Sequence, residues 1–114
     1  MSRDDAVLLD MINAAQKIVD FKQGMDRQDF LQDAKTQSAV LHQLMILGEA
    51  CKRLSIVTRD RAPQIPWRLI AGMRDNLIHE YDDVDLEEIW KTADRDVPAL
   101  MKELRRLSGA DEQG

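Results

Sequence analysis

The hydrophobic residues of this chain recur at helical spacing from one end to the other. The first predicted helix covers residues 3–23, where apolar positions follow Ser2, a suitable N-cap, and stop at Gly24. A short helical piece is predicted around residues 27–33. No stretch alternates between apolar and polar residues as a half-buried strand does, so the pattern predicts helices only.

A third helix is predicted over residues 35–56, with Gly48 on its apolar face. A glycine in mid-helix costs about 1 kcal/mol relative to alanine, so we expect it to admit the close approach of a neighbouring helix. The segment Thr58–Pro66 contains two prolines and is predicted to be a loop. A fourth helix starts at Pro66, a residue suited to the first turn, and runs to about Tyr81.

The last predicted helix begins with a capping box, in which Glu88 follows Asp85 after three residues, and continues to residue 107. Pro98 should kink this helix or divide it in two. Residues 108–114 are small and polar, and we expect them to form a disordered tail. Four main helices and one additional short helix predict an all-α, up-down four-helix bundle in a single domain over residues 1–107.

Composition narrows the class of protein. Of the 114 residues, 44% are hydrophobic and 32% are charged, which is typical of one soluble domain. The chain has no apolar run of membrane-spanning length and no signal-peptide pattern, so we expect a cytoplasmic protein without a membrane partner. Cys51 is expected to be a buried, inert thiol. One cysteine and two histidines form no convincing metal set, and neither a metal nor a cofactor is expected.

Charge is distributed unevenly along the chain. The net charge of −5 argues against a nucleic-acid partner, yet residues 48–74 carry six cations against two acids. Residues 75–96 carry nine acids against two cations. The basic block either binds phosphates or is a solvated helix end and loop, and charge alone leaves both interpretations open. Its cations are Lys52, Arg53, Arg59, Arg61, Arg68 and Arg74.

One segment of the fourth helix carries candidate chemistry. Arg74 supplies a permanent cation, His79 an imidazole and Tyr81 a phenol within eight residues. A ribonuclease that works without a metal needs a fixed cation to hold the scissile phosphate and a group that moves protons. Asp75 and Asn76 precede His79 by four and three residues, so either could orient its ring.

The positions of these residues around the helix raise a problem. An ideal helix turns by about 100° per residue, which places Arg74 on the apolar face, Tyr81 about 20° away and His79 about 140° away. A charge on an apolar face must be paired, for example with Glu49, or must border a cleft formed with a second chain. Either the helix unwinds before His79, or two copies of the motif form the site in a two-fold dimer. His42 has no partner pattern and is interpreted as structural.

The chain resembles the HEPN superfamily, and within it the HepT branch, over about residues 5–107. The spacing Arg-x-x-x-x-His-x-Tyr at residues 74–81 is the leading shared motif. The other shared runs are Leu-Gly-Glu-Ala at 47–50, Ile-Pro-Trp at 65–67, Met-Arg-Asp-Asn at 73–76, Ile-Trp at 89–90 and Val-Pro at 97–98.

This resemblance implies a metal-independent endoribonuclease that works as a homodimer on RNA, with tRNA as one candidate substrate. It assigns Arg74 and His79 as catalytic residues, the first steadying the phosphate and the second acting as general acid or base during attack by the ribose 2′-OH. Asp75 and Asn76 would support the site. The candidate RNA-binding residues, all from the basic block, are Lys52, Arg53 and Arg68.

The same resemblance implies a protein partner. HepT proteins are the toxins of HepT–MntA toxin–antitoxin pairs, in which a MntA-type nucleotidyltransferase transfers AMP from ATP to the motif tyrosine. In this chain that residue is Tyr81, the only tyrosine. An added nucleotide would bring negative charge and bulk beside Arg74 and would repel RNA.

Two other interpretations remain open. The chain could be a non-catalytic HEPN dimer that binds RNA or nucleotide, or a substrate-binding subunit of a nucleotidyltransferase complex. Alternatively, the motif could be purely structural, with Arg74 paired to Glu49. Cleavage that persists in His79→Ala would exclude the enzyme, whereas marked unfolding of Arg74→Ala would favour the structural interpretation.

Overall fold

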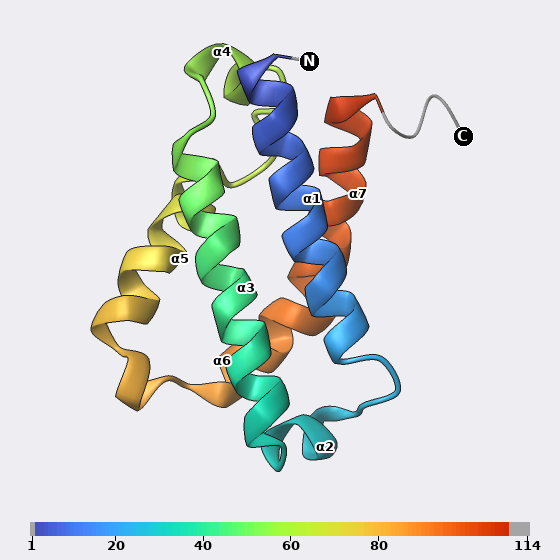
Figure 1. The fold of residues 1–114 in the computed structure, drawn as a ribbon, viewed down its shortest axis with the longest axis vertical. Coiled ribbons are helices and arrows are strands. Elements are labelled where there is room, and N and C mark those ends of the chain that lie inside the picture. The colour runs from blue at the N-terminus through green and yellow to red at the C-terminus, as the bar shows by residue number, and fades with distance from the viewer. Residues whose placement is uncertain (1, 110–114) are drawn as a thin grey trace.

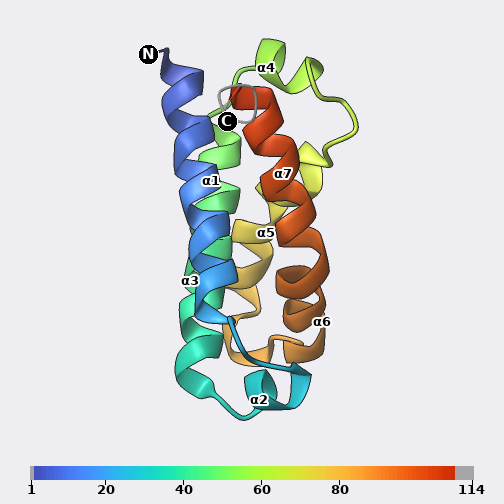
Figure 2. The same ribbon diagram turned by 90° about the vertical axis from the view of Figure 1, so that its right-hand side faces the viewer.

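Four helical rods, alternating in direction, form the body of the molecule in the computed structural model, which describes residues 2–109 (Figures 1 and 2). The first rod packs against the second and the fourth, and the second packs against the third. This arrangement confirms the predicted all-α, up-down four-helix bundle. The rods are α1 (Arg3–Phe21), α3 (Ala34–Lys52), α5 (Trp67–His79), and α6 (Leu86–Lys91), which continues through η2 (Thr92–Asp96) into α7 (Val97–Ser108).

Short elements connect the rods. The predicted short helix is present as α2 (Arg27–Leu31), at the end of the bundle opposite α4 (Ile56–Asp60) (Figure 1). A 3-10 turn, η1 (Tyr81–Asp83), follows α5. Within residues 2–109, no helix is both long and apolar enough to span a membrane.

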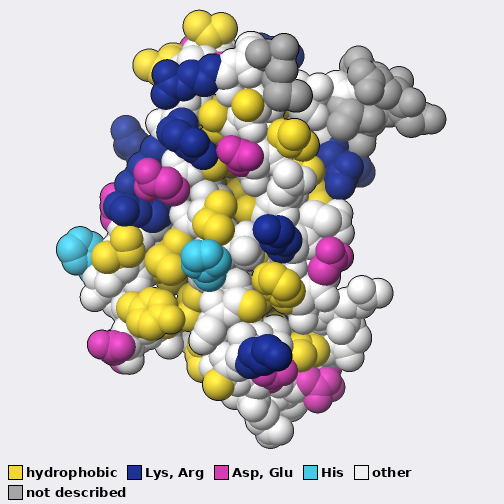
Figure 3. All heavy atoms as spheres, in the orientation of Figure 1, with side chains coloured by type: hydrophobic (Ala, Val, Ile, Leu, Met, Phe, Trp, Pro, Cys, Tyr) yellow, Lys and Arg dark blue, Asp and Glu magenta, His cyan; other side chains and the backbone are white. Residues whose placement is uncertain are grey.

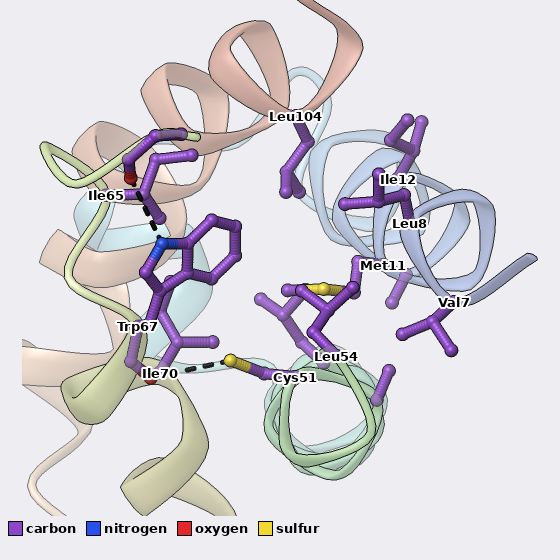
Figure 4. Packing of buried hydrophobic residues seen from close by; sticks show 14 residues of the cluster. Val7, Leu8, Met11, Ile12, Cys51, Leu54, Ile65, Trp67, Ile70 and Leu104 are labelled. Carbon is purple, nitrogen blue, oxygen red and sulfur yellow. Dashed lines mark hydrogen bonds between the residues drawn. The ribbon is translucent and has the colours of Figure 1, made fainter. Parts of the chain in front are cut away.

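The core lies between α1 and α3 and is extended by side chains of α5 and α7 (Figure 4). Trp67, at the start of α5, inserts its indole into this core and donates from Nε1 to the carbonyl oxygens of Arg59 and Ala62, both at 3.0 Å. The Cys51 Sγ donates to the Trp67 carbonyl at 3.4 Å. Cys51 is free and fully buried, and burial raises the pKa of its thiol, which confirms the predicted buried thiol.

Side-chain caps begin the helices at the residues that the sequence indicates. Ser2 forms a complete capping box at the start of α1. Asp85 caps α6 by accepting from backbone N–H groups of its first turn. The predicted box there is only half formed, because the Glu88 carboxylate pairs with Lys91 at 3.5 Å instead of reaching back.

The short helix α4 was not expected, because Thr58–Pro66 was predicted to be a loop and the third helix was predicted to reach residue 56. Instead α3 ends at Lys52, and Ser55 becomes the N-cap of α4 by accepting from the Thr58 amide. Both hydroxyls, of Ser55 and of Thr58, donate to the Asp4 carboxylate of α1. Contacts from a residue more than fifty positions away therefore stabilise a five-residue helix that local propensity does not predict.

Pro98 divides the last helix, as predicted. The preceding segment η2 is π-helical, and the Val97 amide donates to the Thr92 carbonyl across this wider turn. The wider turn accommodates a proline that cannot donate and that would clash with the preceding turn of a regular helix. Ser108, predicted to start the tail, is the last residue of α7, and Gly109 caps it with φ of 81°. The rest of the predicted tail, residues 110–114, lies outside the described residues.

Candidate functional site

The candidate site is built on the contact between α3 and α5. Gly48 of α3 lies against the α5 backbone: a Cβ atom built there would lie 2.9 Å from the Ile70 carbonyl oxygen and 3.1 Å from the Arg74 Cβ. The predicted close approach at Gly48 is thus confirmed, and the approaching helix is the one that carries the motif. This contact fixes the position of Arg74 along the axis of α3.

Four charged side chains of alternating sign cross this contact. Arg74 Nε lies 3.2 Å from Glu49 Oε2, and Arg74 Nη1 lies 3.3 Å from Asp75 Oδ1. Lys52 Nζ donates to the same Asp75 oxygen at 2.9 Å. Lys52, and after it Arg74, hold the pKa of the Asp75 carboxyl below its ordinary value. We refer to these four residues, Glu49, Arg74, Asp75 and Lys52, as the charge ladder.

The Arg74–Glu49 pair is relevant to both interpretations of Arg74, as a structural ion-pair partner and as a cation that holds a phosphate. The pairing that the structural interpretation requires is present. It is not buried, however, because the two side chains are 41% and 53% exposed. Arg74 is therefore paired within the chain and still open to a ligand that approaches from solvent.

His79 is the last residue of α5 and is exposed. The helix is continuous from Trp67 through His79, so the first of the two alternatives, unwinding before His79, does not occur. Neither Asp75 nor Asn76 orients the imidazole, because His79 makes no hydrogen bond or ion pair within residues 2–109 and Asp75 binds Lys52 and Arg74 instead. Arg74 and His79 therefore keep the angular separation of about 140° that an ideal helix gives them.

Tyr81 lies beyond the end of α5, in η1. The predicted helix was two residues too long, so the expected placement of Tyr81 about 20° from Arg74 on one helical face does not hold. Tyr81 is 50% exposed. Ile78, expected on the apolar face, is 48% exposed as well.

Both histidines of the chain are visible on one face of the molecule, over α3 and α5, with hydrophobic side chains between and below them (Figure 3). His42 is exposed and makes no hydrogen bond or ion pair in the described part of the chain, and its interpretation as a residue without a functional role stays a prediction. The exposed large apolar residues of α3, α5 and η1 are Ile46, Leu69, Ile78 and Tyr81. An apolar surface therefore adjoins the charge ladder.

Lys and Arg side chains cluster toward one end of this face (Figure 3). The predicted RNA-binding cations lie at the end of α3 and the start of α5. Lys52 belongs to the charge ladder, and Arg53 pairs with Asp10 at 3.4 Å. Arg68 is exposed on α5 and makes no ion pair within the described range, 2–109. Among the three predicted RNA-binding cations it is thus the unpaired one, and on an ideal helix it lies about 20° from His79, three turns away.

Asn76 is separated from the charge ladder. It lines a groove of about 630 Å³ between α5 and the η2–α7 segment, together with apolar residues such as Met73 and Leu100. Arg74, by contrast, lies against Gly48 of α3, and Asp75 pairs with Lys52 of α3. The structure thus brings Arg74 and Asp75 together but does not bring Asn76 to them. Among residues 2–109, no three His, Cys, Asp or Glu side chains are grouped as metal ligands would be.

Sequence comparison places the chain among known proteins. The pattern of a family described as "Ribonuclease HepT-like" matches residues 11–107. The chain is 42% identical over 100 residues to the "Probable ribonuclease HepT" of Thermococcus cleftensis, covering 88% of this chain and 91% of that protein. It is 38% identical over 111 residues to "Putative RNase MJ0127" of Methanocaldococcus jannaschii, covering 94% and 92%.

A third relative, "Putative RNase MJ0125" of the same archaeon, is 35% identical over 102 residues, which cover 90% of this chain and 88% of that protein. No solved structure matches the chain. The family match includes the whole of α3, α5 and η1, and therefore every residue of the charge ladder together with His79 and Tyr81. On the extent of these matches, this chain belongs to the HepT-like ribonuclease family.

Proposed function

We propose that this protein is a metal-independent endoribonuclease that cleaves RNA through attack of a ribose 2′-OH on the adjacent phosphate. The observation that carries the proposal is the half-exposed Arg74 guanidinium, seated on α3 beside Gly48, on the helix that ends in an exposed imidazole. The names of the relatives support an action on RNA. DNA would not be cleaved, because it lacks the attacking hydroxyl.

In the proposed reaction, the 2′-oxygen forms a bond to phosphorus as the bond from phosphorus to the 5′-oxygen breaks. The products are a 2′,3′-cyclic phosphate and a free 5′-hydroxyl. Arg74 stabilises the negative charge that builds on the non-bridging oxygens. His79 takes the proton from the 2′-OH or gives one to the 5′-oxygen, and water or a second imidazole completes the transfer.

The proposed working unit is a homodimer. Arg74 and His79 point in different directions from one continuous helix, so a two-fold arrangement that sets Arg74 of one copy beside His79 of the other would supply both groups to one phosphate. The exposed apolar side chains Ile46, Ile78 and Tyr81 offer surface that such an interface would cover. Cross-complementation tests this: mixed Arg74→Ala and His79→Ala chains should regain cleavage when they form heterodimers.

The proposed regulation is AMPylation of Tyr81 by a MntA-type nucleotidyltransferase, which would make the pair a toxin–antitoxin system. The Tyr81 hydroxyl would attack the α-phosphorus of ATP, and pyrophosphate would leave. Support comes from the exposure of Tyr81 and from its position two residues after His79. Incubation with such an enzyme and ATP should add one AMP to the intact mass, and Tyr81→Phe should remain unmodified.

A second candidate function is a HEPN dimer that binds RNA or nucleotide without cutting. Two observations favour it: both carboxylates of the charge ladder engage Arg74, and no side chain in residues 2–109 orients His79. Binding of RNA with no loss of full-length RNA would be its expected result.

The experiment that decides between these functions uses protein produced without a partner, incubated with total cellular RNA in EDTA. His79→Ala is the test variant. His42→Ala is its matched control, because it removes the same side chain from the same face of the molecule. Discrete fragments from the wild type and His42→Ala, with intact RNA from His79→Ala, support the nuclease. Intact RNA in all lanes, with no AMP on the protein by mass spectrometry, contradicts it.

A further inference from the structure

We propose that Glu49 is a positioning residue for the cleavage reaction, which orients the Arg74 guanidinium toward the scissile phosphate. The inference rests on the proposed function and adds a residue to its machinery. Glu49 would touch neither the RNA nor the reacting atoms. It would act through Arg74 alone.

The first argument is the arrangement of the backbone. Gly48 holds the base of Arg74 against α3, with 3.1 Å from a Cβ built at Gly48 to the Arg74 Cβ. Glu49 is the next residue along α3, and its Oε2 lies 3.2 Å from Arg74 Nε. Two consecutive residues of α3 therefore hold Arg74: Gly48 contacts its backbone and Cβ, and Glu49 pairs with its guanidinium.

The second argument is the donors that remain on Arg74. A guanidinium has five N–H donors in a rigid plane. Glu49 faces Nε, and Asp75 accepts from Nη1. Within residues 2–109, Nη2 donates no hydrogen bond, so one corner of the plane stays available to a phosphate oxygen. Two carboxylates on two different helices thus define the plane of the guanidinium and the direction in which its open corner points.

The third argument separates positioning from stability. An exposed ion pair contributes about 0–1 kcal/mol to folding, so the 41% and 53% exposed pair is a poor stabiliser of the bundle. An arginine side chain without that pair can rotate about its flexible stem, and misplacement of a charge-stabilising group by about 1 Å can cost about 100-fold in rate. The carboxylate also repels RNA, so its presence weakens substrate binding.

These arguments predict opposite effects on the two kinetic constants. Glu49→Gln should lower kcat by about 10- to 100-fold, because Arg74 loses its fixed orientation. KM for RNA should stay level or fall, because one negative charge near the site is removed. A structural role would instead lower the melting temperature and leave both constants of the folded fraction unchanged.

The experiment measures kcat and KM for Glu49→Gln on an RNA that the wild type cleaves. Glu88→Gln is the matched control, because it removes one carboxylate from another exposed ion pair, the one with Lys91. Circular dichroism checks that both variants fold. A lower kcat without a higher KM in Glu49→Gln alone supports the proposal. An unchanged or higher kcat overturns it, since Glu49 would then be a bystander or a competitor for Arg74.

A double-mutant cycle provides the second readout. If Glu49 acts through Arg74, then Glu49→Gln should lower kcat no further in an Arg74→Lys background, which keeps the charge but loses the guanidinium plane. Additive losses would overturn the positioning role. Absence of cleavage by the wild type would overturn the proposed function and this role together. Wild-type cleavage with additive losses overturns only the role of Glu49.

Discussion

Gly48 on α3 lies so close to Arg74 on α5 that a Cβ atom at Gly48 would be 3.0 Å from the Arg74 amide nitrogen. The backbone atoms that it would meet cannot move aside as a flexible side chain can. Gly48→Ala should therefore reduce the free energy of unfolding by about 1–3 kcal/mol, as overpacked sites do. Urea unfolding at neutral pH measures the effect.

Gly72 is the matched control for this change, because it lies in the same helix as Arg74 and has nothing within 4 Å of a Cβ built on it. Gly72→Ala should raise the free energy of unfolding by up to about 1 kcal/mol through helix propensity. Equal effects of the two substitutions would contradict the assigned close contact. Loss of RNA cleavage in the stabilised Gly72→Ala chain would show that something outside the protomer approaches α5 there.

Asp75→Asn should strengthen the binding of RNA while the fold persists. The Asp75 carboxylate accepts from Lys52 at 2.9 Å and lies 3.3 Å from Arg74. Its removal leaves Lys52 without this partner and Arg74 with Glu49 alone, so both cations attract phosphates more strongly. A 2′-O-methyl RNA, which cannot be cleaved through the 2′-OH, should bind about three- to tenfold more tightly at low salt. The gain should fade as ionic strength rises.

The control for Asp75→Asn is Glu88→Gln, which frees Lys91 on α6 by an equal change of charge. Equal gains in affinity from both variants would mean that net charge alone attracts RNA. Weaker binding by Asp75→Asn would indicate that the carboxylate itself contacts the nucleic acid.

Asp4→Asn should destabilise the protein more at neutral pH than in acid. The hydroxyls of Ser55 and Thr58 donate to Asp4 and hold the pKa of its carboxyl below the ordinary 3.8. A lowered folded pKa gives stability that is present above about pH 4 and is lost as pH falls through the folded value. Melting temperatures at pH 7 should differ by a few degrees between wild type and variant, and the difference should shrink as the pH is lowered from 4 toward 2.

Asp60→Asn is the control for that experiment, because Asp60 lies on α4 and accepts no side-chain hydrogen bond in the described residues. It should leave the melting temperature unchanged at both pH values. A constant difference between Asp4→Asn and wild type from pH 7 to pH 2 would disprove the role assigned to the Asp4 charge.

Cys51 should not react with thiol reagents in the folded protein. Its side chain is fully buried, and burial raises the pKa of the thiol, so little reactive thiolate forms. Ellman's reagent at pH 8 should modify the chain only at urea concentrations that unfold it. Rapid stoichiometric reaction in native buffer would contradict the buried position.

Local signals account for much of what the sequence predicted. The caps at Ser2 and Asp85, the break at Pro98 and the close approach at Gly48 all follow from residues near one another in the chain. The helix α4 does not, because it depends on hydrogen bonds that Ser55 and Thr58 donate to Asp4 of α1. Two prolines in the same segment favoured a loop, and no local feature outweighed them.

In the candidate site, too, local features were predicted and contacts between distant residues were missed. Arg74, His79 and Tyr81 were found from their spacing, and the Arg74–Glu49 pair was anticipated from the cost of a charge on an apolar face. The bond from Lys52 to Asp75 was missed, because it joins residues 23 positions apart on different helices. The exposure of Ile78 was also missed, because a helical wheel does not show which neighbours cover a helix. In the structure α5 packs mainly on α3 and leaves a groove toward α7.

That one-sided packing has a consequence for dynamics. Because α5 rests mainly on α3, while α1 is held by both α3 and α7, we expect the segment from Trp67 to Asp83 to open at a lower free energy than α1. Native-state hydrogen exchange should show amide protection in α5 that fails at a lower free energy than in α1. Arg74, His79 and Tyr81 all lie on this segment, so the turnover of RNA and access to the tyrosine would respond to a local opening equilibrium that global melting curves do not report.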